Sequence, residues 1–330
     1  MENDRSTADK RKASVARLSV ASNAMLVLLK LIVGIAIGSV SVISEAIHSG
    51  VDLLAAAIAY FAVKTSGKPA DSEHPFGHGK VENISGTVEA LLIFAAAVWI
   101  IFEAVKKLMN QEPLEAPGLG VAVMMISAMA NIFVSRRLFL VGKETDSVAL
   151  QADAWHLKTD VLTSAGVMSG LAVIWIGGML FPGLDLRWVD PVAAIGVALL
   201  IIKAACKLTI ESARDLLDVS LPPEEEGAIR KCISAFAPTV RGFHKLRTRK
   251  SGSNRFVEFH VRVEASMSID ESHRIADMIS CDIKHQFPGT VVTIHIEPCN
   301  CALASEGSCG CLLKEDVRNA MRRKAQESTE

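Results

Sequence analysis

Long apolar segments dominate the first two thirds of this 330-residue chain, and a charged sequence of ordinary soluble character follows from about Asp215. A helix that spans a bilayer needs about 20 predominantly apolar residues. Six segments meet this requirement: approximately Val15–Ile37, Val40–Val63, Ile84–Leu108, Leu119–Val141, Ala149–Leu171 (extending towards Met179) and Pro191–Ile210. The pattern predicts an α-helical membrane protein with six transmembrane helices.

The distribution of Lys and Arg predicts how these helices are oriented. Basic residues such as Arg11 and Arg136 lie in the N-terminal segment and in the loops after the second and fourth apolar segments. The loops on the opposite side carry only Lys106, Lys107 and Arg187. Because cytoplasmic loops are enriched in Lys and Arg, we expect both termini in the cytoplasm. The polar start of the chain, MENDRSTADKRK, does not resemble a secretory signal.

The charged C-terminal third has shorter periodic elements. Helical periodicity and strand-like alternation follow one another in the order helix, strand, strand, helix, strand. These elements are Glu224–Phe236, His244–Lys250, Arg255–Val263, Ser268–Phe287 and Val291–Glu297. The order αββαβ predicts a small two-layer α+β domain, ferredoxin-like, with antiparallel strands.

Two of the predicted membrane helices carry a His and an Asp four residues apart. His48 and Asp52 lie in the second segment, and His156 and Asp160 lie in the fifth. Side chains at i and i+4 share one face of a helix, so each pair presents an imidazole beside a carboxylate. A lone His is often a packing residue, but each Asp at bilayer depth needs a compensating partner. Two such faces turned towards each other supply the four ligands of a tetrahedral zinc site.

This quartet predicts a protein that moves a divalent metal ion across a membrane. Mixed imidazole and carboxylate ligation suits Zn2+, with Co2+, Fe2+ or Cd2+ as alternatives. Ligands must lose protons to hold a metal, and His titrates near pH 6.5, so metal and protons compete for the site. We therefore expect exchange of metal for protons. Neither H-E-x-x-H, G-x-S-x-G nor G-x-x-x-x-G-K-[ST] occurs in the chain, so we expect a transporter driven by an ion gradient, not an enzyme.

A second candidate site lies in the loop after the second segment. Asp71, His74 and His78 fall within PADSEHPFGHGK, close to the membrane on the predicted cytoplasmic side. Pro75 and the neighbouring glycines predict a shaped turn. These side chains could bind metal at the entrance to the membrane domain, or they could belong to a polar loop that caps the next helix.

The C-terminal third contains two further candidate groups. His244, His260, His273, His295 and Glu297 are dispersed, and histidines like these are individually more often surface or core residues than ligands. His295 and Glu297 share one face of a strand. Cys299, Cys301, Cys309 and Cys311 form a CNC…CGC cluster. In a reducing cytoplasm this clustering favours soft-metal binding over disulfides; the alternative is a flexible tail with free thiols.

Composition narrows the class of protein further. Half of the residues are apolar, the mean hydropathy is +0.32 and the formal net charge is −1. A nucleic-acid-binding protein normally has a concentrated basic face, so we expect no nucleic-acid partner.

Across residues 12–300 the chain resembles the cation diffusion facilitator family of metal–proton antiporters. The segments that carry the resemblance include ISEAIHSGVDLLAA, PADSEHPFGHGKVENISG, LQADAWHLKTDVLTS and LLDVSLP, together with RGFHKLRTRKSGSNRFVEFHVRV and VTIHIEP. The resemblance implies a homodimer of six-helix units paired through a cytoplasmic domain, as in bacterial zinc transporters. It places the transport site on the intramembrane quartet, where His48 replaces an Asp found in some members and indicates zinc selectivity.

The resemblance also assigns roles outside the membrane. It places a metal site on Asp71, His74 and His78, and zinc sites of the dimer interface on His244, His260, His273, His295 and Glu297. It implies a charge interlock between Lys80 and Asp218. Glu297 stands where Asp is frequent in the family. The cysteine tail has no counterpart in the common family pattern.

Together these observations predict a Zn2+/H+ antiporter that exports zinc, in a bacterial inner membrane. The expected parts are a cytoplasmic N-terminal segment (1–13), a transmembrane transport domain (14–211), a cytoplasmic metal-binding and dimerisation domain (212–300) and a tail (301–330). The alternatives are a membrane-anchored metal sensor or assembly scaffold without transport, or the same transporter selective for Cd2+, Fe2+ or Co2+.

Overall fold

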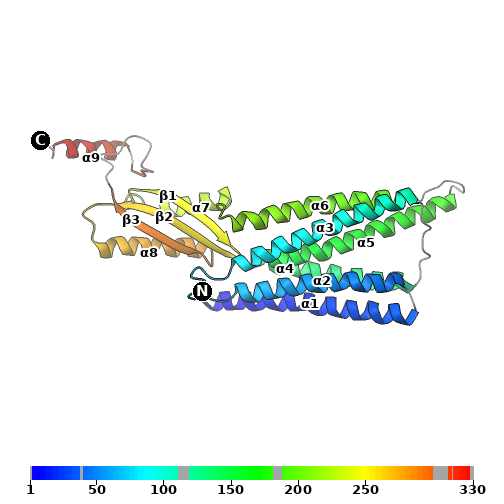
Figure 1. Cartoon of the computed structure of the whole chain (residues 1–330). Coiled ribbons are helices and arrows are strands. Elements are labelled where there is room, and N and C mark those ends of the chain that lie inside the picture. Colours follow the sequence, from blue (N-terminus) through cyan, green and yellow to red (C-terminus); the bar gives the residue numbers. More distant parts are fainter. Residues whose placement is uncertain are drawn as a thin grey trace. The chain divides into compact units, whose positions relative to one another are not determined.

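The structure is a computed structural model that describes residues 2–37, 40–110, 119–180, 188–299, 311–313 and 315–327. Two compact units divide the chain after Leu216: a helical unit, Glu2–Leu216, and a C-terminal unit, Leu217–Glu330. Figure 1 shows long helices in the first unit and a small sheet with helices in the second. The prediction of a helical domain followed by a small α/β domain is confirmed.

Six long helices make up the described part of the helical unit. They are α1 (Glu2–Ile37), α2 (Val40–Ser66), α3 (Lys80–Asn110), α4 (Leu119–Glu144), α5 (Val148–Leu180) and α6 (Val189–Leu216). Among the residues that the structure describes, five stretches are long and apolar enough to cross a bilayer: Thr7–Ala36, Ala46–Ser66, Lys80–Lys106, Met125–Glu144 and Pro191–Leu216.

The helices pack so that α2 and α5 lie together near the centre of the unit. α2 packs against α1, α3 and α5, while α5 also packs against α3, α4 and α6. Leu138, Leu150 and Leu157 form part of a buried apolar cluster between these helices. Small buried residues such as Ala55 and Ala56 allow close approach of the helix backbones. This packing places the two predicted His-Asp helices side by side.

Helix α1 buries a polar stripe against this apolar packing. Lys12, Ser19, Asn23 and Lys30 are all buried, although the helix has apolar residues on its other faces. Their spacings of seven, four and seven residues return to the same face of a helix. Buried polar groups need partners in the protein, so this stripe directs polar contacts into the helical unit.

One end of the helical unit is joined by a buried carboxylate clamp, which comprises Lys12, Ser66, Glu82 and Ser147. One oxygen of Glu82 accepts hydrogen bonds from Lys12 Nζ at 3.1 Å and Ser66 Oγ at 2.6 Å. Ser147 Oγ donates to the other oxygen at 2.5 Å. Glu82 is fully buried and Lys12 almost so. The clamp therefore links α1, α2, α3 and the turn before α5, and it holds the start of α3 in place.

The C-terminal unit has two layers. Its elements are α7 (Pro223–Ser234), β1 (Gly242–Ser251), β2 (Asn254–Val263), α8 (Ile269–Gln286), β3 (Val291–Pro298) and α9 (Glu315–Glu327). Side chains of α7 and α8 pack with the sheet in one apolar core that includes Ile233, Phe259 and Ile279. Ser268 and Glu271 form a capping box that starts α8.

The strand directions correct one prediction. The strands lie in the order β1-β2-β3, and β1 pairs with β2 in an antiparallel hairpin whose turn contains Gly252 in a left-handed conformation. However, β2 and β3 pair in parallel, so the prediction of a purely antiparallel sheet is wrong. The reason is the connection: α8 crosses over between β2 and β3, and a crossover helix returns the chain in the same direction.

The C-terminal core supplies a stability prediction. Ile279 is fully buried between α8 and the sheet, so Ile279→Ala should destabilise this unit by about 2–5 kcal/mol through lost contacts and a residual cavity. Its neighbour Met278 is half exposed, so Met278→Ala should cost far less. Urea denaturation of the segment Leu217–Glu330, followed by circular dichroism, measures both. Equal destabilisation by the two variants would contradict the described core.

Candidate metal centres

The intramembrane quartet comes together where α2 meets α5. His48 and Asp52 lie on α2, and His156 and Asp160 lie on α5. One ligand atom each of His48, Asp52 and Asp160 lies within 4.8 Å of the others. His156 Nε2 lies 3.1 Å from Asp52 Oδ1. The i, i+4 spacing thus gives each helix one face with a His and an Asp, and these two faces meet. The contact between His156 and Asp52 joins the two helices.

The quartet is largely buried and has polar atoms without hydrogen-bond partners, both of which suit a bound cation. Asp52 and His156 are buried, Asp160 is half-buried and His48 is exposed. Asp160 Oδ2 and His156 Nδ1 have no hydrogen-bond partner among the residues that the structure describes. A buried carboxylate oxygen without a partner is costly. A divalent cation would satisfy such an oxygen and would compensate the carboxylates' negative charge.

Two further buried carboxylates lie in the same helices and were missed by sequence reasoning. Glu89 on α3 and Asp153 on α5 are fully buried. Ser85 Oγ donates to one oxygen of Glu89 at 3.2 Å, but the other oxygen and both oxygens of Asp153 lack partners within the described ranges. Asp153 precedes His156 by three residues and therefore shares its face of α5. That spacing was the signal available in the sequence.

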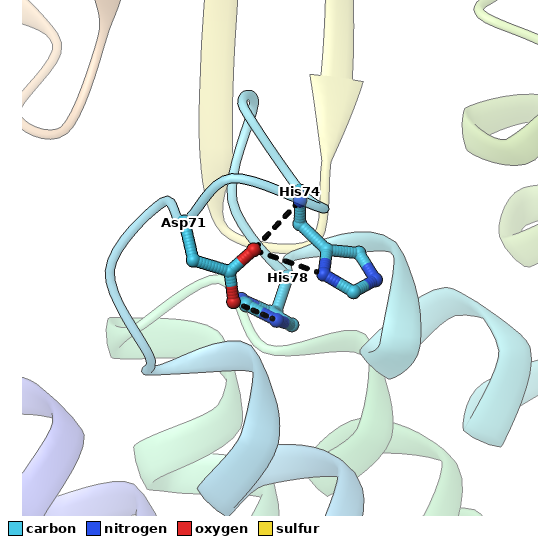
Figure 2. A group of neighbouring side chains, drawn as sticks. All are labelled: Asp71, His74 and His78. Carbon is cyan, nitrogen blue, oxygen red and sulfur yellow. Dashed lines mark hydrogen bonds and ion pairs between the residues drawn. The ribbon is translucent and has the colours of Figure 1, made fainter.

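The loop site is formed by a tight turn around one carboxylate. Asp71 Oδ1 lies 3.2 Å from His74 Nδ1, and Asp71 Oδ2 lies 3.3 Å from His78 Nε2, as Figure 2 shows. The two imidazole centroids are 4.2 Å apart. Gly77 adopts a left-handed conformation, with φ of 81°, which turns the chain between the two histidines. The structure therefore brings all three predicted residues of this site together.

Hydrogen bonds and nearby charges in the loop favour the ionised form of the Asp71 carboxylate, which is the form that binds a cation. The backbone N–H groups of His74 and Glu73 donate to Asp71 Oδ1 at 2.7 Å and 3.1 Å. The bond from the His74 backbone is the main cause of the lowered pKa of Asp71, assisted by the histidine side chains. The His78 side chain is only 9% exposed, and its Nδ1 has no partner in the described structure. Asp71 and His74 are exposed, so the site is open on one side.

A third cluster crosses all three strands of the C-terminal unit. His244 on β1 pairs with His260 on β2, which pairs with His295 on β3. Glu297 points among them: its Oε1 lies 2.6 Å from His260 Nδ1, and its Oε2 lies 3.3 Å from His244 Nε2. His295 Nε2 is 3.8 Å from Glu297 Oε1. Sheet register therefore gathers four of the five predicted residues.

His273 lies apart from this cluster within one chain. It is on α8, its side chain is 71% exposed, and its Nε2 lies 3.5 Å from Asp277 Oδ2 one helical turn later. Spacing along the sequence could not separate it from the other histidines, because its distance from the strands depends on how α8 packs on the sheet.

Ionisation favours the metal-binding forms of two cluster residues. The hydrogen bond with His260 lowers the pKa of Glu297, so this carboxylate remains ionised at neutral pH. Burial, followed by the charge of Arg262, lowers the pKa of His244, so its imidazole remains neutral. A neutral imidazole and an ionised carboxylate are the forms that ligate metals.

The structure describes two of the four cysteines predicted to bind metal in the tail, and both residues of the predicted charge interlock. Cys299 is buried and Cys311 is half-buried, whereas Cys301 and Cys309 lie outside the described residues. Lys80 Nζ donates to the Leu216 carbonyl at 3.4 Å within the helical unit. Asp218 Oδ1 accepts from Arg249 at 3.3 Å within the C-terminal unit. The interlock between Lys80 and Asp218 would join the two units and stays a prediction.

Comparison with known families agrees with this organisation. Residues 16–217 match the cation efflux transmembrane domain, and residues 221–299 match the cation efflux protein cytoplasmic domain. These matches cover most of the chain, so the protein is an integral membrane protein of the cation diffusion facilitator family. It is a cation efflux transporter and not an enzyme, as predicted.

Individual relatives extend over most of the chain. It is 38% identical to an uncharacterized transporter, sll1263, of Synechocystis over 79% of this chain and 82% of the relative. It is 32% identical to the cation-efflux pump FieF of Klebsiella pneumoniae over 88% of this chain and 95% of the relative. The metal-bound C-terminal domain of the CzcD transporter from Thermotoga maritima is 28% identical, covering 23% of this chain and 87% of that domain, with a TM-score of 0.22.

The C-terminal cluster gives a pH prediction. Below about pH 6.5 protons occupy ordinary histidines, but the lowered pKa values of His244 and Glu297 delay protonation of these two groups. Zn2+ bound at the cluster should therefore persist at neutral pH and be released only at a pH below that at which ordinary histidines bind protons. Equilibrium dialysis of the purified full-length protein and of Glu297→Ala gives the cluster's share by difference. Release that begins above neutral pH would contradict the described ionisation.

Proposed function

We propose that this transporter is a Zn2+/H+ antiporter that exports zinc from the cytoplasm through the intramembrane quartet. The observation that carries the proposal is the meeting of two His-Asp faces, with Asp52 and His156 3.1 Å apart between α2 and α5. Two imidazoles and two carboxylates match the donor preference of Zn2+ in a four-coordinate site. Lipid surrounds the helices, and both termini lie in the cytoplasm of a bacterial cell.

Proton coupling follows from the chemistry of the same residues. A cation displaces protons from the imidazoles and carboxylates that bind it, and protons arriving from the opposite side displace the cation. When the quartet is open to the cytoplasm it loads zinc; when it is open to the other side, external protons release the zinc and return in its place. The two carboxylates are essential to this exchange because they compensate the charge of the ion in a low-dielectric site.

The loop site has the position and ionisation of a cation-collecting site at the entrance. Asp71, His74 and His78 directly precede α3, whose first turn carries the clamp residue Glu82. The ionised Asp71 carboxylate attracts cations, and its exposed side allows exchange with solvent. The resemblance to the family implies the same assignment, and the clamp connects the base of the loop to three other parts of the helical unit.

In the C-terminal unit the cluster around Glu297 would hold a regulatory zinc ion in a homodimer. His244 Nδ1 has no partner in the part of the chain described, and the neighbouring donors fit Zn2+. Because His273 is exposed and is not among the neighbouring ligands of the cluster in its own chain, it would add a ligand across a dimer interface. The Lys80–Asp218 interlock would carry the dimer's geometry to the membrane helices. Zinc capture by the cysteine tail completes the proposal.

Removal of either carboxylate of the quartet tests transport. Asp52→Ala and Asp160→Ala should each reduce zinc flux into proteoliposomes by at least about tenfold, since each removes a ligand and leaves the ion's charge uncompensated. Asp270→Ala, which changes an exposed acid on α8 that pairs with Arg274, is the matched control and should transport normally. Zinc binding without any flux in the wild-type protein would favour the sensor or scaffold alternative.

Selectivity is tested at His48. Replacement of its imidazole by a carboxylate in His48→Asp increases the oxygen content and negative charge of the site, which favours harder cations. Competition of Zn2+ transport by Cd2+, Fe2+, Co2+ and Mn2+ should show that the wild type prefers Zn2+ and that the variant accepts Fe2+ or Mn2+ more readily. If the wild type prefers another ion, that ion takes the place of zinc in the proposal. If both proteins have the same selectivity, His48 is not part of the site.

A further inference from the structure

A cation transporter keeps a buried positive charge beside its proposed transport site. Lys30, near the end of α1, is only 6% exposed although it is surrounded by apolar sequence. An ammonium group at this depth in a membrane protein is costly and needs a partner. This fixed positive charge lies beside residues that are arranged to bind a metal cation, which it would repel.

The position of Lys30 is set by a direct contact with α2. Lys30 Nζ donates a hydrogen bond to Ser49 Oγ at 2.8 Å, and Ser49 is itself buried. Ser49 follows His48 directly in α2 and precedes Asp52 by three residues. The hydrogen bond therefore anchors the ammonium group next to the α2 half of the quartet.

The charge of Lys30 also reaches the α5 half. The positive charge of Lys30 acts on the carboxylate of Asp160, as do those of His48 and His156 when protonated. Asp160 Oδ2 has no hydrogen-bond partner in the described structure, so this oxygen is available to a cation. The charge of a fixed ammonium group and that of an arriving metal ion would thus both act on the same carboxylate.

We infer that Lys30 is a built-in counter-charge, positioned by Ser49, that weakens the hold of the quartet on its metal ion and so permits release. The inference rests on the proposed transport function. With neutral imidazoles and two ionised carboxylates, the empty site would carry two negative charges. The ammonium group of Lys30 reduces this to one. The empty site is therefore stabilised, and a bound divalent ion is repelled by the ammonium group. Both effects lower affinity, because like charges repel strongly in a site of low dielectric.

Lower affinity matters for a transporter because the ion must leave. A site with four good ligands and a full complement of negative charge would retain zinc and turn over slowly. Removal of the positive charge should therefore make binding tighter and transport slower. This split distinguishes a counter-charge from a residue that merely supports the fold, since damaged packing would weaken binding and transport together.

The test measures zinc flux into proteoliposomes as a function of zinc concentration. Lys30→Met, which removes the charge and keeps much of the side-chain volume, should lower the apparent KM by about tenfold and reduce the maximal rate several-fold. Lys30→Arg retains the charge and should restore values near those of the wild type. Lys207→Met is the matched control, because Lys207 is exposed on α6 and pairs with Glu211.

Ser49→Ala provides a second variant. It leaves Lys30 in place but removes its anchor, so it should change KM and maximal rate in the same directions by a smaller factor. If Lys30→Met does not fold, Ser49→Ala decides the question. An unchanged or raised KM in the folded variants would overturn the inference.

Equilibrium dialysis separates this inference from the proposed function. Zinc bound by each purified protein, minus zinc bound when Asp160→Ala is also present, gives the affinity of the quartet without any transport. Absence of flux in the wild type would remove the proposed function, and the dialysis of Lys30→Met would still test the counter-charge. Wild-type flux with equal quartet affinity in wild type and Lys30→Met would remove the counter-charge alone.

Discussion

Compensation of ionised groups inside the helical unit is the constraint on which the rest of this structure depends. Asp52 and His156 are buried and lie 3.1 Å apart on different helices. Neither group would be stable alone at this depth, because a low-dielectric environment penalises an isolated charge by several kcal/mol. The contact therefore fixes which faces of α2 and α5 meet. Once these faces meet, His48 and Asp160 are carried to the same place by the helical repeat, and a site for a cation results from the same packing that satisfies the charges.

The same constraint explains the other buried polar groups of the helical unit. The carboxylate clamp around Glu82 is fully hydrogen-bonded and joins four parts of the chain, so it serves as a structural joint directly after the loop of Asp71, His74 and His78. Through its hydrogen bond to Ser49, Lys30 places a positive charge next to the α2 half of the quartet. Glu89 and Asp153 differ from both, because three of their oxygen atoms lack partners among the residues described. The helical unit thus contains satisfied groups where it needs rigidity and unsatisfied carboxylates beside the site where cations are expected.

The local pattern of apolar and polar residues was sufficient to predict many of these elements. The features that it did not predict depend on contacts between residues far apart in the sequence. The predicted second segment, Val40–Val63, nearly coincides with α2, because apolar length is a property of the segment itself. By contrast, α1 begins at Glu2 and not near Val15, since backbone hydrogen bonds continue through polar residues that apolar length does not count. Both His-Asp pairs could be read from i, i+4 spacing, but the clamp between Lys12, Glu82 and Ser147 joins residues far apart in sequence. The parallel direction of β3 was missed because strand alternation carries no information about the pairing partner, although the intervening helix indicated a crossover.

The central claim is that two imidazoles and two carboxylates from α2 and α5 bind one cation together. X-ray absorption spectroscopy at the zinc edge tests it most directly, on full-length protein in which Asp71→Ala and Glu297→Ala remove the loop and C-terminal sites and replacement of the four tail cysteines by Ala removes the tail site. The account predicts one zinc ion with four nitrogen and oxygen neighbours at about 2.0–2.2 Å and the scattering pattern of two imidazoles, lost on further replacement of Asp160. Zinc surrounded by sulfur, or by oxygen alone, or zinc that remains after that replacement, would contradict it.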